Sequence, residues 1–280
     1  MQFLYIKWNI DPEIFRIGGF ALRYYSVLFA VAFLMGFILM KKMYEKEGLS
    51  EQSLQPFLVY VIAGTIIGAR LGQVFFYEFD YFKHHLLEII IPFRITNKGF
   101  EWTGYQGLAS HGGAIGILIA LILFCKKYKQ DFLHTLDKLV IVVSLAGFFI
   151  RTGNLFNSEI IGKPTVLPWA FIFERVDFMP RHPSQLYEAI AYLLIFFVLW
   201  KLYQTKGLQL KKGFLLGLFL VLVFLARFLI EFTKENQEAF ENALPINMGQ
   251  ILSLPFIIVG AYLMLRRERT KDKMYLKPEE

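Results

Sequence analysis

The segment 139–162, LVIVVSLAGFFIRTGNLFNSEIIG, decides how this chain folds. Residues 139–150 are apolar apart from one serine, whereas residues 151–162 carry an arginine, two asparagines and a glutamate. If the apolar run spans a membrane, these polar groups lie in or against lipid. Burying them there is costly unless they pair, so an ionisable residue in such a segment indicates a functional site. A lone arginine at a membrane edge more often only snorkels to the interface, but a cluster of four polar groups is harder to explain in that way.

The composition of the whole chain indicates a polytopic membrane protein. Of the 280 residues, 56% are hydrophobic and 17% are aromatic, while only 19% are charged, which is not the composition of a soluble domain. The net charge of +7 lies mainly in short loops between apolar runs, where basic residues set membrane orientation and do not indicate nucleic-acid binding. Residues 1–20 lack the apolar core of a cleavable signal peptide. The single cysteine, Cys125, excludes an internal disulfide and a CxxC metal or redox site.

Seven apolar runs are long enough to cross a hydrocarbon core of ~30 Å, which takes about 20 residues. The predicted spans are 22–40, 57–77, 105–125, 137–151, 185–203, 213–232 and 247–265. Clusters of Lys and Arg follow the first, third, fifth and seventh spans, and all four clusters fall on one side if there are seven spans. Loops rich in Lys and Arg are cytoplasmic. The pattern therefore predicts an amino terminus outside the cell and a cytoplasmic carboxyl terminus.

We therefore expect an all-α polytopic membrane protein with a single integral membrane domain over residues 1–280. Residues 78–104 resemble an interfacial arm more than a span, because their apolar stretch is short. Residues 152–184, which hold four prolines, predict a small extracytoplasmic head. Residues 266–280 are polar and predict a cytoplasmic tail.

Several polar side chains fall at one depth when each span is counted from its inner edge at 1.5 Å per residue. Five of them come out about 20–22 Å from that edge, and these are Arg70, His111, Arg151, Tyr187 and Arg227. Tyr25 and Gln250 come out slightly higher. Each residue alone could be a satisfied packing group, but coincidence across separate spans is harder to dismiss. It predicts one polar cavity that opens toward the outer leaflet.

The predicted cavity has more arginines than carboxylates. It contains three arginines, Arg70, Arg151 and Arg227, and two glutamates, Glu159 and Glu231. Since Arg227 and Glu231 are four residues apart on one helix face, they are expected to pair with each other. The remaining guanidinium groups suit an anion, because their planar fork matches phosphate oxygens.

His111 precedes Gly112 and Gly113. A histidine there could act as a base at neutral pH, and the glycines would let a bulky substrate approach the backbone. The alternative is a hydrogen-bonded packing group, which is what a lone membrane histidine more often is. Ser110 and His111 do not form a nucleophilic dyad, because neighbours in a helix point apart. No HExxH motif or phosphate-binding loop is present, and neither a metal nor a cofactor is expected.

Motifs along the whole chain resemble those of the prolipoprotein diacylglyceryl transferase family. The segment 151–162 is similar to that family's signature, although Ile150 and Leu155 replace its usual glycine and phenylalanine. The further matching segments are 22–25 (LRYY), 68–72 (GARLG), 110–113 (SHGG), 181–188 (RHPSQLYE), 227–231 (RFLIE) and 248–253 (MGQILS). They occur in the family's order over almost the whole chain, which makes a chance resemblance remote.

The resemblance implies transfer of the diacylglyceryl group of phosphatidylglycerol to the lipobox cysteine of a bacterial prolipoprotein signal peptide. It also implies a multi-pass protein of the bacterial cytoplasmic membrane, in contact with the lipid bilayer, whose active site faces the outer leaflet. The predicted cavity fits such a reaction, because the donor is an anionic lipid and the thiol comes from the other substrate.

The charges suggest a role for each candidate residue. His111 is the expected base for the thiol, with an arginine-bound water or the lipid phosphate as alternatives. Arg151 and Arg227 are expected to stabilise negative charge on the leaving phosphate. The remaining expected substrate-binding residues are Tyr25, Arg70, Asn154, Asn157, Glu159, Gly162 and Glu231.

Two other classes of protein remain open. A flippase for anionic lipids would also place arginines within the membrane, but it usually has inverted repeats or broken helices, which the sequence does not suggest. An intramembrane protease needs a Ser/His or an Asp/Asp pair at matched depth, and the aspartates of the chain lie outside the predicted spans or at their edges. The transferase interpretation therefore fits best.

Overall fold

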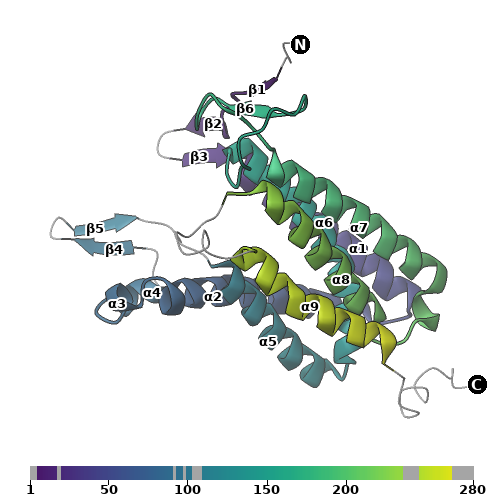
Figure 1. Cartoon of the computed structure of the whole chain (residues 1–280). Coiled ribbons are helices and arrows are strands. Elements are labelled where there is room, and N and C mark those ends of the chain that lie inside the picture. Colours follow the sequence, from purple (N-terminus) through teal and green to yellow (C-terminus); the bar gives the residue numbers. More distant parts are fainter. Residues whose placement is uncertain are drawn as a thin grey trace, which may run out of the picture. The chain divides into compact units, whose positions relative to one another are not determined.

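The computed structural model describes residues 5–17, 20–90, 93–96, 99–102, 109–235 and 246–266. This part of the chain is mostly helical, at 71%, and seven of its helices are long and apolar enough to cross a membrane. They are α1 (Tyr24–Lys46), α2 (Leu54–Phe76), α5 (Ser110–Tyr128), α6 (Phe132–Asn157), α7 (Ser184–Lys206), α8 (Phe214–Ile230) and α9 (Met248–Leu265), as Figure 1 shows. The predicted number of spans is confirmed, and the chain is a multi-pass membrane protein.

Two of the spanning helices run further than predicted. Helix α1 continues six residues beyond the expected end at residue 40, because the Lys- and Glu-rich residues that follow are good helix formers whose long side chains can reach polar surroundings. Helix α6 includes residues 152–157, which the sequence placed in the extracytoplasmic head. Thr152 Oγ1 donates to the carbonyl of Phe148 at 2.8 Å, and the polar side chains that follow find partners described below. The helix therefore does not need to end at Arg151.

Short strands connect the helices, so the all-α prediction is right for the spanning segments and wrong for the segments between them. Strands β1 (Ile6–Trp8), β6 (Phe171–Phe173) and β7 (Pro180–Arg181) form a three-stranded sheet in the order β1–β6–β7. Two antiparallel hairpins are built by β2 (Glu13–Ile17) with β3 (Phe20–Arg23), and by β4 (Phe93–Thr96) with β5 (Gly99–Trp102). Regularly alternating apolar and polar residues mark a strand, but segments of two to five residues are too short for the pattern to stand out.

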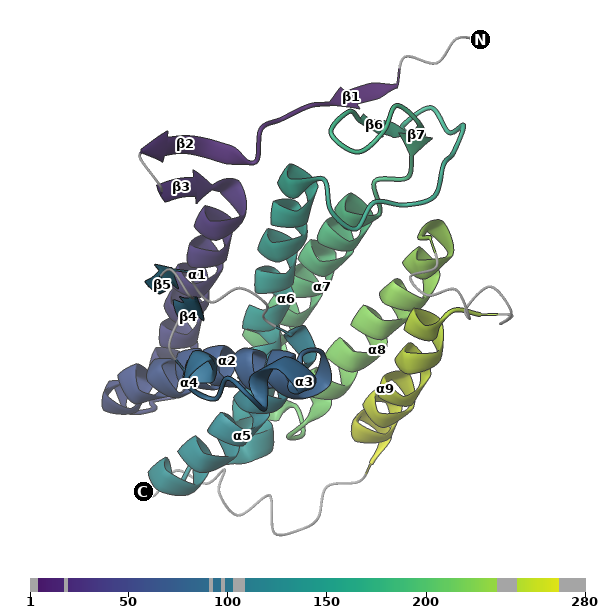
Figure 2. The same cartoon turned by 90° about the vertical axis from the view of Figure 1, so that its left-hand side faces the viewer.

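The chain forms two compact units. The first comprises residues 1–43 and 136–280, and the second comprises residues 44–135. In the first unit, α6 and α7 lie side by side, with the β1–β6–β7 sheet near one end of both helices (Figure 2). The indole of Trp8 on β1 donates to the carbonyl of Leu155 on α6 at 3.0 Å. This bond, with the packing of Trp8 on Leu155, Phe171 and Phe173, fixes the sheet to the end of α6 that carries the signature.

Helix α8 is attached to α6 at the opposite end of the same unit. The carboxylate of Asp137 accepts hydrogen bonds from the backbone amides of Gly213 and Leu216, at 2.6 and 2.7 Å. A carboxylate there satisfies free amides at a helix amino terminus. Helices α8 and α9 then pack closely where Gly217 meets Gly260. Asp137 thereby fixes the start of α8 against α6, and the glycine contact fixes α9 against α8.

The second unit is organised by a glycine contact between α2 and α5. Gly64, Gly68 and Gly72 recur every fourth residue on α2 and face Gly112 and Gly116 on α5. A Cβ on Gly112 would lie 2.6 Å from the Cα of Gly72, so only glycine permits this approach. Spacing of small residues by four is typical of closely packed helices in membranes.

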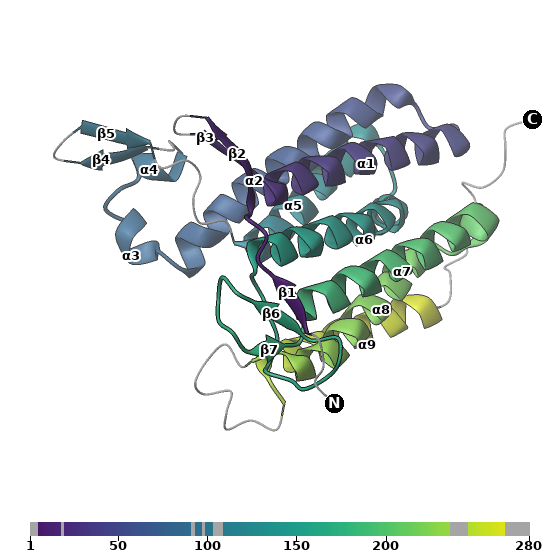
Figure 3. The ribbon, with the colours of Figure 1, turned by 90° about the horizontal axis from the view of Figure 1, so that it is seen from above.

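The predicted arm over 78–104 continues directly from α2 (Figure 3). It consists of two short helices, α3 (Phe79–Phe82) and α4 (Leu87–Ile90), and of the β4–β5 hairpin. Its last two residues, and the predicted tail beyond Arg266, lie outside the described residues. An interfacial position for the arm stays a prediction.

Candidate active site

The signature segment ends α6 in a strained turn. Ser158 and Ile160 both adopt left-handed backbone conformations, with φ of 56° and 57°. A β-branched residue rarely tolerates this conformation, and such strain concentrates at functional sites. The backbone amide of Glu159 donates to the carbonyl of Asn154 at 3.0 Å. The turn therefore brings Glu159 back over the helix that precedes it.

Glu159 is the hydrogen-bond acceptor for both signature asparagines. Asn154 Nδ2 donates to one carboxylate oxygen at 3.1 Å, and Asn157 Nδ2 donates to the other at 3.0 Å. Asn154 Oδ1 in turn accepts a hydrogen bond from Arg151 Nη1 at 3.2 Å. Four of the predicted site residues thus form one connected network on the last two turns of α6. Arg151, Asn154 and Asn157 follow one another at intervals of three residues, which places them on adjoining faces of that helix, and the turn brings Glu159 back to them.

A second carboxylate, Glu188 on α7, joins Arg151 to Lys234. Arg151 Nε lies 2.8 Å from Glu188 Oε2, which is the distance of an ion pair, although its N–H is not aligned for a hydrogen bond with that oxygen. Lys234 Nζ lies 2.8 Å from Glu188 Oε1 and 3.3 Å from Glu231 Oε2. The Glu188 side chain is only 1% exposed. A buried carboxylate that pairs with two cations at once fixes the position of both.

The predicted pair between Arg227 and Glu231 does not form among the described residues. Helix α8 ends at Ile230, and Glu231 begins a 3-10 turn that runs to Thr233. Side chains three residues apart eclipse in a 3-10 helix, so Glu231 meets Lys234 instead. Arg227 forms no ion pair in the described part of the chain, and its buried Nε has no hydrogen-bond partner there.

Buried polar atoms without a hydrogen-bond partner gather at this end of the first unit. Among the described residues they are Asn157 Oδ1, Ser158 Oγ, both amide atoms of Gln185, Glu188 Oε2 and Arg227 Nε. All six belong to the adjoining ends of α6, α7 and α8, and Glu188 Oε2 is engaged only by its ion pair. A buried polar atom left unpaired costs about 1–3 kcal/mol. Their concentration in one place is the pattern expected of a site whose polar ligand supplies the missing partners.

Tight backbone contacts position two other predicted site residues. The ring of Tyr25 on α1 lies against Gly153, where a Cβ would come within 2.7 Å of it. Gly162 is enclosed by Ser184, Thr233 and His182, and its amide donates to the carbonyl of His182 at 2.8 Å. The next amide, of Lys163, donates to the Thr233 carbonyl at 2.7 Å. Gly162 therefore links the signature segment to the turn that carries Glu231 and Lys234.

An ion-pair group outside the spanning helices supports the same turn. Arg181 binds Asp177 through Nη2 at 2.5 Å and Glu235 through Nη1 at 2.7 Å. The hydrogen bond from Arg181 lowers the pKa of Asp177, and the same bond raises the pKa of Arg181. Beside them, burial lowers the pKa of His182, which keeps this imidazole neutral. The group therefore holds one guanidinium between two carboxylates.

The remaining two predicted residues, Arg70 and His111, belong to the second unit. Arg70 Nη2 and Nε donate to the carbonyls of Glu88 and Ile89, at 2.6 and 3.1 Å, and its guanidinium lies 4.8 Å from the ring centre of Phe82. These contacts fasten the arm to α2, and a contact of Arg70 with lipid stays a prediction. His111 is exposed in the first turn of α5.

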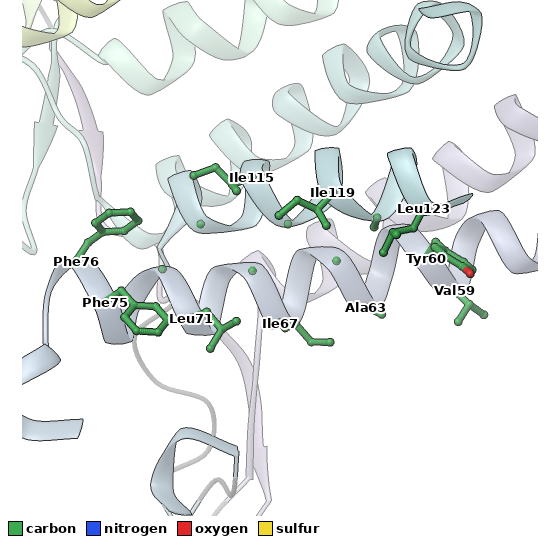
Figure 4. A pocket seen from close by; sticks show the side chains of 16 residues that line it. Val59, Tyr60, Ala63, Ile67, Leu71, Phe75, Phe76, Ile115, Ile119 and Leu123 are labelled. Atoms are coloured by element: carbon green, nitrogen blue, oxygen red, sulfur yellow. The ribbon is translucent and has the colours of Figure 1, made fainter. Parts of the chain in front are cut away.

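The second unit also contains an open groove of about 690 Å³ between α2 and α5. Figure 4 shows its edges, with Ile67 and Leu71 on α2 and Ile115 and Ile119 on α5. Glycines and apolar side chains line it, and Tyr60 is its one residue with a polar side-chain group. No acid, base or cation is among the residues that line the groove. Nor do three His, Cys, Asp or Glu side chains come together as metal ligands anywhere in the described ranges.

The sequence analysis missed three residues of the cluster, Gln185, Glu188 and Lys234. Glu188 could have been found, because it is a carboxylate inside the predicted span 185–203 and an ionisable residue there indicates function. Lys234 lies just beyond the predicted span 213–232, where a lysine is ordinary. Gln185 lies in the matching segment 181–188, but as an uncharged residue it was not singled out. Only the fold shows that its amide is fully buried.

Comparison with known proteins identifies the family of this chain. The family model described as prolipoprotein diacylglyceryl transferase matches residues 12–266. Three similar proteins carry the name phosphatidylglycerol–prolipoprotein diacylglyceryl transferase. The protein from Bacteroides fragilis is 45% identical over 93% of this chain and 95% of its own length, that from Tolumonas auensis is 44% identical over 95% and 99%, and that from Chloroherpeton thalassium is 46% identical over 94% and 94%. This chain belongs to the prolipoprotein diacylglyceryl transferase family.

Proposed function

We propose that this protein transfers the diacylglyceryl group of phosphatidylglycerol to the cysteine thiol of a prolipoprotein. In this reaction the sulfur attacks the glyceryl carbon that bears the phosphate oxygen. A C–S bond forms and the C–O bond breaks, so its electron pair leaves with glycerol phosphate, while the thiol gives up its proton. The similar proteins align with this chain over nearly their whole length, and each is named for this activity.

The observation that carries the proposal is the unpaired guanidinium of Arg227 beside the buried cluster of α6, α7 and α8. Arg151 and Lys234 already share the carboxylate of Glu188, whereas Arg227 has no anionic partner in the described residues. A phosphodiester would supply that anion, and guanidinium groups bind phosphate oxygens in planar pairs. In a site poor in water, Arg227 and Arg151 would stabilise the charge that develops on the leaving phosphate.

The roles of the uncharged residues follow from what they can offer a lipid headgroup. Asn157 keeps a buried acceptor oxygen without a partner, which suits a hydroxyl of the glycerol headgroup. Asn154 and Glu159 hold Arg151 in place through the network on α6. Tyr25, Gly162, Glu231 and Arg70 are proposed to shape the substrate site.

The thiol must come from the second substrate, because the single cysteine of this chain, Cys125, is buried in α5. His111 is our proposed base for that thiol, since it presents an exposed imidazole in the first turn of α5 and only the thiolate is reactive. The second substrate is proposed to be a signal peptide with its lipobox cysteine. The protein is proposed to lie in the bacterial cytoplasmic membrane, with its amino terminus and active site toward the outer face.

The test is transfer by purified protein from phosphatidylglycerol to a synthetic lipobox peptide. The expected result is release of glycerol phosphate with an equal gain of diacylglyceryl mass on the peptide, and no gain on a peptide with serine in place of cysteine. A flippase would move labelled lipid between leaflets of a vesicle and leave the peptide unchanged, and that outcome would overturn the proposal. A fully active His111→Gln variant would assign the base to the lipid phosphate or to an arginine-bound water instead.

A further inference from the structure

Gln185 is the most completely buried polar side chain of the cluster that lacks any partner. The residue is 0% exposed, and neither its amide oxygen nor its amide nitrogen makes a hydrogen bond with described protein atoms. By contrast, the buried amide of Gln250 on α9 is occupied, because it donates to the Phe228 carbonyl and accepts from the Asn247 amide. Burial of an amide with both ends unpaired costs free energy, so Gln185 destabilises the protein when the site is empty.

The position of Gln185 points it at the site. It lies in the first turn of α7, three residues before Glu188, and side chains three apart share a helix face. Glu188 on that face is held between Arg151 and Lys234. Side chains on a helix lean toward its amino terminus, which places the Gln185 amide on the amino-terminal side of Glu188.

The two free ends of the amide define the ligand chemistry. The nitrogen needs an acceptor and the oxygen needs a donor. A phosphate or an ester carbonyl offers acceptors only, and an ammonium group offers donors only. A hydroxyl offers both. We propose that Gln185 determines headgroup specificity by hydrogen bonding to a hydroxyl of the glycerol headgroup next to the bound phosphate. This inference rests on the proposed function.

The experiment measures transfer to a lipobox peptide from phosphatidylglycerol and from phosphatidylpropanol, whose headgroup has no free hydroxyl. Wild-type protein is expected to prefer phosphatidylglycerol by about tenfold or more, since a site built to bind a hydroxyl rejects the analogue without it. Gln185→Met keeps the length of the side chain and removes the amide. Its kcat/KM for phosphatidylglycerol is expected to fall about tenfold or more, while its kcat/KM for phosphatidylpropanol changes little, so the preference disappears.

The thermal unfolding temperature distinguishes this role from a purely structural one, because the two roles predict changes in opposite directions. Removing an unpaired buried amide is expected to raise the thermal unfolding temperature of the lipid-free protein, so Gln185→Met should be more stable and less selective at once. Gln204→Leu is the matched control, because it changes the same residue type at an exposed position about 28 Å along the same helix. The control is expected to leave the preference unchanged.

Three outcomes would overturn the inference. The first is an equal loss on both lipids together with a lower unfolding temperature, which would make Gln185 a structural residue. The second is an unchanged lipid preference with a higher KM for the peptide, because a peptide group also offers a donor and an acceptor. The third is a wild-type protein that transfers from both lipids equally well. A wild-type protein that transfers from neither lipid would contradict the proposed function itself.

Gln185→Asn, which keeps a shorter amide, is expected to retain part of the preference.

Discussion

At the scale of single residues, one buried carboxylate controls the arrangement of the cluster. Glu188 is the partner of Arg151 on α6 and of Lys234 after α8. Removing one member of a buried ion pair leaves the other charges without compensation, whereas removing both partners can be nearly neutral. The geometry around Glu188 therefore leads to a prediction about stability that does not depend on the reaction.

Glu188→Gln is expected to lower the free energy of unfolding by about 3 kcal/mol or more, because Arg151 and Lys234 lose their shared anion. Thermal or chemical unfolding in detergent micelles measures this effect. Glu78→Gln, at an exposed position, is the control and is expected to change the stability little. Adding Lys234→Met to Glu188→Gln should recover part of the loss. An additive loss in the double variant would show that the two residues do not interact.

At the scale of elements, the contact of α2 with α5 depends on individual glycines. Gly112 and Gly113 are neighbours with opposite surroundings. A Cβ on Gly112 would strike the backbone of Gly68 and Gly72, whereas one on Gly113 would find ordinary contact with the Ala69 Cβ at 3.6 Å. The two positions form a matched pair within one motif.

Gly112→Ala is expected to separate α2 from α5 and to lower the unfolding temperature by several degrees, since overpacking of a tight contact costs about 1–3 kcal/mol. Gly113→Ala is expected to leave it unchanged or slightly higher, because alanine is the better helix former. The measurement is thermal unfolding of both variants beside wild type. Equal effects of the two substitutions would contradict the described packing.

The Arg181 group predicts a pH dependence of stability. The pKa of Asp177 is lowered below its ordinary value of 3.8 by Arg181. A lowered carboxyl pKa contributes stability that is present above the unfolded-state pKa and is lost as the pH falls through the folded-state value. Wild type is therefore expected to unfold at a higher temperature than Asp177→Asn at pH 6, and the difference should shrink below pH 3.8. Because Asp177 is partly exposed to solvent, the effect should be small, about 1 kcal/mol or less. A difference that grows on acidification would contradict this pairing.

The sequence predicted the spanning elements better than the segments between them. Seven apolar runs were visible because a hydrocarbon core demands about 20 apolar residues in succession. The continuation of α6 to Asn157 was not predicted. Hydropathy counts its last residues as polar and does not show that their side chains form hydrogen bonds with one another. Strands as short as β7, with two residues, carry no periodic pattern at all.

For the site, the sequence identified the charged residues of α6 but not their partners. Arg151, Asn154, Asn157 and Glu159 lie within one motif, and their network is local. The prediction that Glu231 pairs with Arg227 was wrong, because the change from α-helix to 3-10 turn after Ile230 alters which side chains meet. Gln185 is neutral, so only its burial and lack of partners reveal it.

At the scale of the whole molecule, the distribution of Lys and Arg predicts the orientation in the membrane. The single cysteine makes a labelling test simple, because Cys125→Ala gives a cysteine-free background. In that background, Arg175→Cys between β6 and β7 is expected to react with a membrane-impermeant maleimide in intact cells. Lys206→Cys at the end of α7 is expected to react only after the membrane is opened. The reverse pattern would contradict an outer active site.

In the proposed reaction, the unpaired Arg227 binds and stabilises the phosphate of an anionic lipid. The most direct measurement is the rate of diacylglyceryl transfer from phosphatidylglycerol by Arg227→Lys, with Arg16→Lys as an exposed control. Lysine keeps the charge but loses the planar fork, and loss of such a donor typically lowers kcat by about 10²–10³. We expect a loss of this size in Arg227→Lys and none in the control. An Arg227→Lys protein as active as wild type would contradict the claim.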